Sequence, residues 1–430
     1  MAADHGCGCR GFSGGGVTAP EVPTVTKLEV LPMFGQSEMR PKPDLALADA
    51  LRAMQDSPPY YLAGTRTTLG NAIEVQGATG ADRTATGRTD RSVPATGFAA
   101  YTGDQVSPGF TFAQLRAAQD DTLGVVLADP SYGGQEILAF DTTRTDKFIG
   151  ANQVYHLREA ARVGTALRIE VTAPYVFLFQ GTQAKGTPGA QYRTEFDLVY
   201  GQLLGAMAPA YSAAPRLIGI VNGGDVNTNG DTYDTPETQY QLLLDYGGII
   251  AGWQRDFKIS DTNIHTSTAV QVLEGETAYR AAAEVEAGNP WNITYAVAKS
   301  GASVTVTFAL RPGETLMEID DLFDSYGGAA TCRHFGFEAE DGIAAASWAG
   351  NTVTLTLNNA SARWLRLAQQ VQNVSTFADA NGLTMSAHRS TLFGSHTWPS
   401  LTVAGETIRR PVPGFSGTLS GNTFVPFSAT

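Results

Sequence analysis

Short apolar runs separated by helical patterns organise the first two thirds of the chain. Four such runs, at 25–34, 125–128, 176–179 and 217–221, have the length of buried strands. Helical spacing of apolar residues follows Asp44 and recurs at 151–164, 191–207 and 267–287. Alternation of helices with wholly apolar strands predicts an α/β fold, with a parallel sheet covered by helices on both faces.

The period of the pattern changes after Pro290. Val304, Val306 and Phe308 alternate with Ser and Thr residues, and the stretch 352–357 repeats this alternation. A period of two with turn residues between the runs predicts antiparallel sheet with one solvated face. We therefore expect an all-β, sandwich-like module at 289–430, after an α/β domain at 24–288.

Two further segments lack such a pattern. Residues 1–23 are rich in Gly and Pro and cannot bury a core, so they predict a flexible arm that anchors the chain to a partner. Residues 65–108 are rich in Gly, Thr, Asp and Arg with little periodicity, which predicts a long loop or short hairpins.

Composition excludes several classes of protein. The chain has 29 Lys and Arg against 42 Asp and Glu, a formal charge of −13, which argues against a nucleic-acid partner. No apolar run reaches the roughly 18 residues of a membrane span. Three cysteines, Cys7, Cys9 and Cys332, supply neither a disulfide framework nor a structural zinc site. The first 16 residues have no apolar signal-peptide core.

Polar and Gly-rich blocks stand where ligands bind in open α/β sheets, at the carboxyl ends of the strands. Gly35-Gln-Ser-Glu-Met39 follows the first run, a block ending in Gly133-Gly134 follows the second, and Gln180-Gly-Thr182 follows the third. A fourth block, Asp261-Thr-Asn-Ile-His265, precedes the last helix. These blocks are the candidate site.

In order and spacing, the blocks resemble those of the SGNH hydrolases, in particular the sialate O-acetylesterase-like branch. That branch has Gly-Gln-Ser-Asn-Met, a Gly-Gly pair, Gln-Gly-Glu or His-Gly-Glu, and Asp-x-x-His before a helix with Leu-Gly-Glu, to which Leu273-Glu-Gly-Glu276 is similar. The resemblance covers residues 28–285. It implies an SGNH-type three-layer α/β/α domain and removal of O-acetyl groups from a carbohydrate, with no cofactor required.

The resemblance also implies roles for particular residues. Ser37 would be the nucleophile, His265 the general base and Asp261 the carboxylate that orients its ring. The backbone N–H groups of Ser37 and Gly134, with the Gln180 side chain, would form the oxyanion hole.

Three positions depart from the family pattern. Thr262 stands where the family has its carboxylate, with Asp261 one residue further from His265. Glu38 replaces an asparagine and Thr182 a glutamate. Two hypotheses are therefore kept: an active esterase, and an SGNH scaffold with a weak or inactive site in a structural or receptor-binding protein.

A second feature follows the fourth apolar run. Asp225, Asn227 and Asn229 occupy positions 1, 3 and 5 of a calcium-type loop, with Gly at position 6 and Asp231 at position 7. Position 12 is Pro236 rather than glutamate, with Glu237 next to it. The stretch is consistent with a structural Ca²⁺ site, although its composition favours a polar turn.

The β module resembles the domain that follows SGNH modules in tailed bacteriophages and gene-transfer particles, through the strand order 304–308, Leu316, 334–338 and 353–357. This resemblance implies a virion or phage-like particle outside the cell, with the arm 1–23 docked to other particle proteins. It also implies a host surface polysaccharide as partner and a fibre, spike or receptor-binding homo-oligomer.

Trp348 and Trp398 are interpreted either as sugar-stacking residues or as core. A bacterial enzyme exported without a cleaved signal is a third hypothesis.

Overall fold

The fold is given by a computed structural model of the 430-residue chain. It describes residues 25–35, 39, 42–54, 60–63, 96–100, 105–128, 136–144, 149–180, 187–221, 234–257, 267–319, 333–368, 376–378, 384–386 and 390–427.

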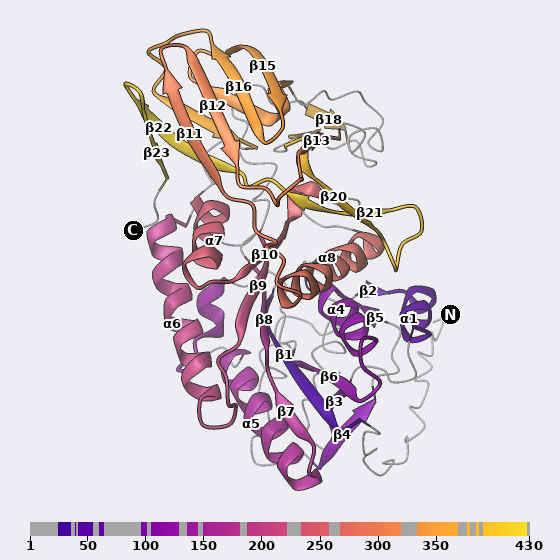
Figure 1. Ribbon diagram of the computed structural model, residues 1–430. Coiled ribbons are helices and arrows are strands. Elements are labelled where there is room, and N and C mark those ends of the chain that lie inside the picture. The colour runs from indigo at the N-terminus through magenta and orange to yellow at the C-terminus, as the bar shows by residue number, and fades with distance from the viewer. Residues whose placement is uncertain are drawn as a thin grey trace, which may run out of the picture.

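An eight-stranded sheet forms the centre of the N-terminal part (Figure 1). Its strands run in the order β10-β9-β8-β1-β6-β3-β4, and β7 pairs with β1. The bounds are β1 (Lys27–Gly35), β3 (Tyr60–Ala63), β4 (Gly97–Ala100), β6 (Leu123–Ala128), β7 (Glu170–Thr172), β8 (Tyr175–Phe179), β9 (Arg216–Val221) and β10 (Ile249–Trp253). Neighbours from β10 to β3 are parallel, and β4 runs antiparallel to β3. The predicted parallel sheet is confirmed.

Helices cover both faces of this sheet, as Figure 1 shows. On one side lie α5 (Ile149–Leu167), α6 (Gly189–Met207) and α7 (Asp234–Asp245), and on the other α1 (Leu45–Arg52), α4 (Pro108–Ala117) and α8 (Thr268–Glu286). Val30 of β1 packs into the core on the first side, while Leu31 and Met33 pack into the core on the second. Burial on two faces explains why the strands read as unbroken apolar runs.

Side-chain caps fix where three helices begin. Asp44 accepts a hydrogen bond from the backbone N–H of Leu47 (3.0 Å), and Ser107 and Ser267 cap α4 and α8 in the same way. The helix expected after Asp44 is confirmed, as are α5, α6 and α8. The sequence pattern did not predict α4, α7 or β10. Short 3-10 turns complete this part: η3 (Ile137–Phe140) and η5 (Gln254–Asp256).

The C-terminal part is built from antiparallel sheets, as predicted. One four-stranded sheet has the order β11 (Tyr295–Ser300), β12 (Ser303–Phe308), β16 (Thr352–Leu357) and β15 (Ile343–Ala349). The other has the order β14 (Phe337–Ala339), β17 (Trp364–Leu367), β22 (Phe415–Ser420) and β23 (Thr423–Pro426), and β14 follows the 3-10 turn η7 (Arg333–Gly336). Val304 of one sheet and Leu365 of the other belong to one buried core, so the two sheets form a sandwich.

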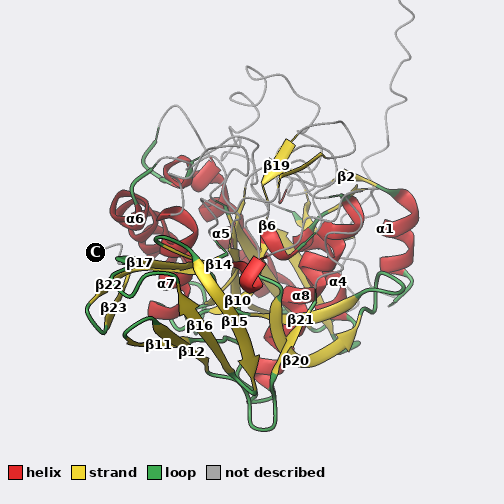
Figure 2. Cartoon of the chain, turned by 90° about the horizontal axis from the view of Figure 1, so that it is seen from above, coloured by secondary structure: helices red, strands yellow, loops and turns green. Residues whose placement is uncertain are grey.

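Smaller sheets complete the molecule, which Figure 2 shows from above. They comprise β13 (Leu316–Glu318) with β20 (Leu392–Pro399) and β21 (Thr407–Pro411), β18 (Thr376–Ala378) with β19 (Thr384–Ser386), and β2 (Lys42–Pro43) with β5 (Gln105–Val106). The β20–β21 hairpin lies against α8, and its residue Ile408 belongs to the core under that helix.

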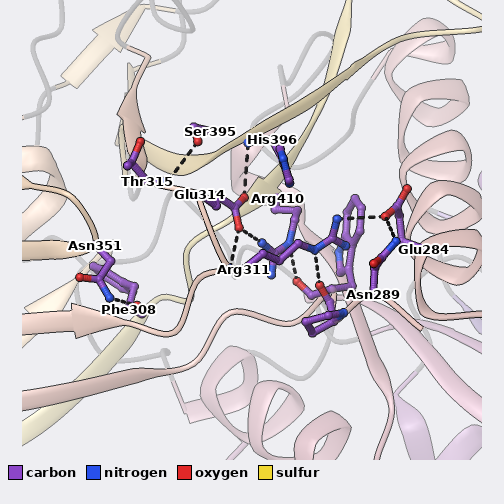
Figure 3. A network of polar contacts seen from close by, with 12 residues as sticks. Glu284, Asn289, Phe308, Arg311, Glu314, Thr315, Asn351, Ser395, His396 and Arg410 are labelled. Atoms are coloured by element: carbon purple, nitrogen blue, oxygen red, sulfur yellow. Dashed lines mark hydrogen bonds and ion pairs between the residues drawn. The ribbon is translucent and has the colours of Figure 1, made fainter. Parts of the chain in front are cut away.

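A buried polar seam joins the two parts of the chain (Figure 3). Arg410 of β21 and Glu314 form an ion pair with almost no exposed surface. Arg311 pairs with Glu284 of α8 at 2.9 Å. The domain boundary at residues 288/289 stays a prediction. None of the described helices is both long and apolar enough to cross a membrane.

Candidate active site

Three of the four candidate blocks follow strands that end at one edge of the parallel sheet. In the strand order, β8, β1 and β6 are direct neighbours, and their last residues are Phe179, Gly35 and Ala128. The blocks that carry Gln180, Ser37 and Gly134 follow these strands directly. Because parallel strands share one carboxyl edge, these three strands end side by side, immediately before the three blocks in the sequence.

Most of the residues proposed from the sequence lie outside the described part of the chain. This holds for Ser37, Gly134, Asp261 and His265. It also holds for the suggested calcium ligands Asp225, Asn227, Asn229 and Asp231. In the described part, no group of three or more His, Cys, Asp or Glu side chains is placed to hold a metal ion.

Gln180 is the described member of the predicted oxyanion hole, and its side chain is completely buried. Its Oε1 accepts a hydrogen bond from the Tyr192 hydroxyl of α6 at 2.9 Å. That hydroxyl accepts a hydrogen bond from Nε2 of Gln239 in α7, also at 2.9 Å, and the same Nε2 donates to the backbone oxygen of Gln180. Burial raises the pKa of the Tyr192 hydroxyl well above its usual range, so this group remains a proton donor.

The end of β1, just before Ser37, is held from both faces of the sheet. Gln153 of α5 donates from Nε2 to the backbone oxygen of Met33 at 2.8 Å. On the other face, a Cβ at Gly109 of α4 would lie 2.4 Å from the sulfur of Met33 and 3.6 Å from Cε of Met39. Glycine at this position of α4 therefore leaves room for the Met33 side chain near the end of β1.

The Glu-Gly-Glu motif of α8 has a structural role. A Cβ at Gly275 would lie 2.3 Å from the backbone oxygen of Pro108, so glycine allows close contact between α8 and α4. Glu276 is fully buried and accepts hydrogen bonds from three residues of the turn between β20 and β21. The motif thus joins the last helix of the α/β part to the β module.

A largely apolar cavity lies at the carboxyl end of β10. Its volume is about 70 Å³, measured as space that water-sized molecules can occupy. Among its lining residues, Trp253 and Phe257 precede the block with His265 in the sequence, and Val270 and Leu273 follow it. Strands β20 and β21 form the opposite wall, with Phe393 among their lining residues. The β module therefore contributes one wall of this cavity.

The structure describes the surroundings of Trp398 and of one histidine, His156. Trp398 stacks on the buried Trp291 with ring centroids 5.3 Å apart, and the guanidinium groups of Arg280 and Arg311 lie within 6 Å of its ring centre. This surrounding favours the packing interpretation of Trp398. His156 is buried in α5, and burial lowers its pKa to about 4, as expected for a packing residue that stays neutral.

One solved structure has a fold similar to that of this chain. No family model and no curated protein matches the chain. Among solved structures, a carbohydrate acetylesterase from Xanthomonas citri, XAC1771, matches with a TM-score of 0.54 and 18% sequence identity, over 86% of this chain and 81% of that one. The chain has a fold similar to that of this acetylesterase. A protein from Arabidopsis thaliana matches at 14% identity over 60% of this chain and 97% of that one, with a TM-score of 0.33.

Proposed function

We propose that the protein is a serine esterase that removes O-acetyl groups from a carbohydrate, with Ser37 as nucleophile, His265 as general base and Asp261 as the carboxylate that orients His265. The strand order β8-β1-β6 supports this proposal, because the three strands that precede these motif blocks in the sequence end side by side at one edge of the sheet. The fold shared with a carbohydrate acetylesterase supports it.

The proposed reaction follows the chemistry of serine hydrolases. Oγ of Ser37 attacks the acetyl carbonyl carbon while His265 takes its proton, and the carbonyl oxygen becomes an oxyanion. The N–H groups of Ser37 and Gly134 and the Gln180 amide donate hydrogen bonds to that oxyanion. The intermediate then releases the sugar hydroxyl, which receives the proton from His265, and water cleaves the acetyl-serine ester in a second, equivalent step.

The predicted setting forms part of the same proposal. The carbohydrate would be a host surface polysaccharide, and the segment 1–23 would attach a homo-oligomer to a phage-like particle. A structural calcium ion on the loop from Asp225 to Asp231 and the sialate branch of the family also stay predictions.

Acetate release by the full chain tests the activity. The substrates are p-nitrophenyl acetate and an O-acetylated polysaccharide, and the variants are Ser37→Ala and, as a control, Ser361→Ala in an exposed turn of the β module. We expect Ser37→Ala to lower kcat/KM at least about a thousandfold, and Ser361→Ala to match the unaltered protein. Equal turnover in all three proteins would contradict the proposal, and glycan binding without turnover would favour a structural or receptor-binding role.

A further inference from the structure

Three buried side chains from three different elements form a directed chain of hydrogen bonds. Gln180 follows β8, Tyr192 lies in α6 and Gln239 lies in α7, and each is at most 1% exposed. The amide nitrogen of Gln239 has two hydrogens, and it donates to two oxygens, the backbone oxygen of Gln180 and the hydroxyl of Tyr192. Both hydrogens of this nitrogen are therefore used.

This arrangement fixes the direction of the next hydrogen bond. The Tyr192 hydroxyl has one hydrogen, and since it accepts from Gln239, its own hydrogen is directed to Gln180. A carbonyl oxygen of Gln180 can accept that hydrogen, whereas an amide nitrogen in the same place cannot. A flipped Gln180 would leave the buried hydroxyl hydrogen without an acceptor, which is energetically costly. Oε1 therefore faces Tyr192, and Nε2 is at the opposite side of the amide.

We propose that Tyr192 and Gln239 are positioning residues, which hold the Gln180 amide with its nitrogen oriented as an oxyanion donor. This inference rests on the proposed function. A freely rotating amide would present oxygen to the developing negative charge part of the time, and that orientation repels the charge. The two residues thus act on the reaction only through Gln180.

Replacing the hydroxyl of Tyr192 tests this inference against a matched control. Tyr211 is also buried in the same core, and its hydroxyl donates to the backbone oxygen of Leu157 at 2.7 Å, away from Gln180. We expect Tyr192→Phe to lower kcat for p-nitrophenyl acetate about tenfold with little change in KM, a fraction of the roughly hundredfold loss on removing an oxyanion donor outright. Tyr211→Phe should lower the unfolding temperature to a similar extent and leave kcat within about twofold.

A double-mutant cycle identifies the route of the effect. In a Gln180→Ala background, Tyr192→Phe should cause no further loss of kcat, because its effect passes through the missing amide. Gln239→Met, which removes both donated hydrogen bonds, should likewise reduce kcat only when Gln180 is present. Losses that multiply in the double variant, or a Tyr192→Phe enzyme that behaves like Tyr211→Phe, would overturn the inference. These outcomes differ from failure of the proposed function, which would appear as turnover that survives Ser37→Ala or as absence of turnover in the unaltered protein.

Discussion

Replacing Glu276 by glutamine should detach the β20–β21 turn from α8. The Glu276 carboxylate has no exposed surface, and four donors converge on it. The Ser400 hydroxyl and the Leu401 N–H lie at 2.6 Å, the Thr402 N–H lies at 3.2 Å, and the Thr402 hydroxyl is the fourth donor. The carboxylate therefore fixes three successive residues of the turn.

The expected change in the free energy of unfolding follows from the loss of one acceptor oxygen in glutamine. One of its two terminal atoms is a nitrogen, which donates and cannot accept. If its oxygen faces Ser400 and Thr402, its nitrogen faces the N–H of Leu401, and two donors oppose each other. A hydrogen bond to a charged group contributes about 1.5–3 kcal/mol. With the weaker acceptance of a neutral oxygen added, Glu276→Gln should lower the free energy of unfolding by about 2–4 kcal/mol.

Urea unfolding followed by tryptophan fluorescence measures this change. Trp398 lies in β20 next to the turn and stacks on Trp291, so the emission reports on the contact between hairpin and helix. The control is Glu136→Gln, at an exposed position, and should change the free energy by less than about 0.5 kcal/mol. If Glu276→Gln were as stable as this control, the turn would not depend on the carboxylate and the reasoning would be wrong.

Two further predictions concern buried charge. Burial lowers the pKa of His156 from about 6.5 to about 4. Between these two pH values the unfolded chain binds a proton on this residue and the folded chain does not. The stability that His156 contributes is therefore complete above pH 6.5 and is lost as the pH falls toward 4. Between pH 7 and pH 4.5, the free energy of unfolding should fall by about 2–3 kcal/mol less in His156→Leu than in the unaltered protein. Equal decreases in the two proteins would contradict this cause. Arg410→Met should cost about 3–5 kcal/mol because it leaves Glu314 buried without its counter-charge, and adding Glu314→Leu should recover at least half of that loss in urea unfolding. A double variant less stable than Arg410→Met would contradict the second prediction.

The sequence predicted those elements in which burial is continuous along a strand or alternates with a regular period. The strands β1, β6, β8 and β9 appear as apolar runs, and β12 and β16 as alternation, because their surroundings are uniform on each face. Helix α4 was not predicted since almost every residue in it is buried, which removes the polar stripe by which a surface helix is recognised.

Helix α7 was missed for a different reason. Its first turns carry the polar residues Thr235, Glu237 and Gln239, which are all buried, and the sequence pattern assigned this stretch to a polar loop. Their burial is satisfied by distant partners: Glu237 accepts from the backbone N–H and the hydroxyl of Ser416, 179 residues further along the chain. No local pattern contains such a contact.

The same limit applies to the candidate site. Gln180 could be proposed from the block that follows its strand, because position at a strand end is visible in the sequence. Tyr192 and Gln239 could not, since their role depends on contacts across 12 and 59 residues between elements of the folded chain.

Labelling by a fluorophosphonate tests the central claim most directly, because this probe reacts covalently with an activated serine. The account predicts one adduct per chain, located by mass spectrometry on the peptide that contains Ser37, and its loss in His265→Ala. The absence of any adduct, or an adduct on another serine, would contradict the proposal that Ser37 is the nucleophile of an esterase.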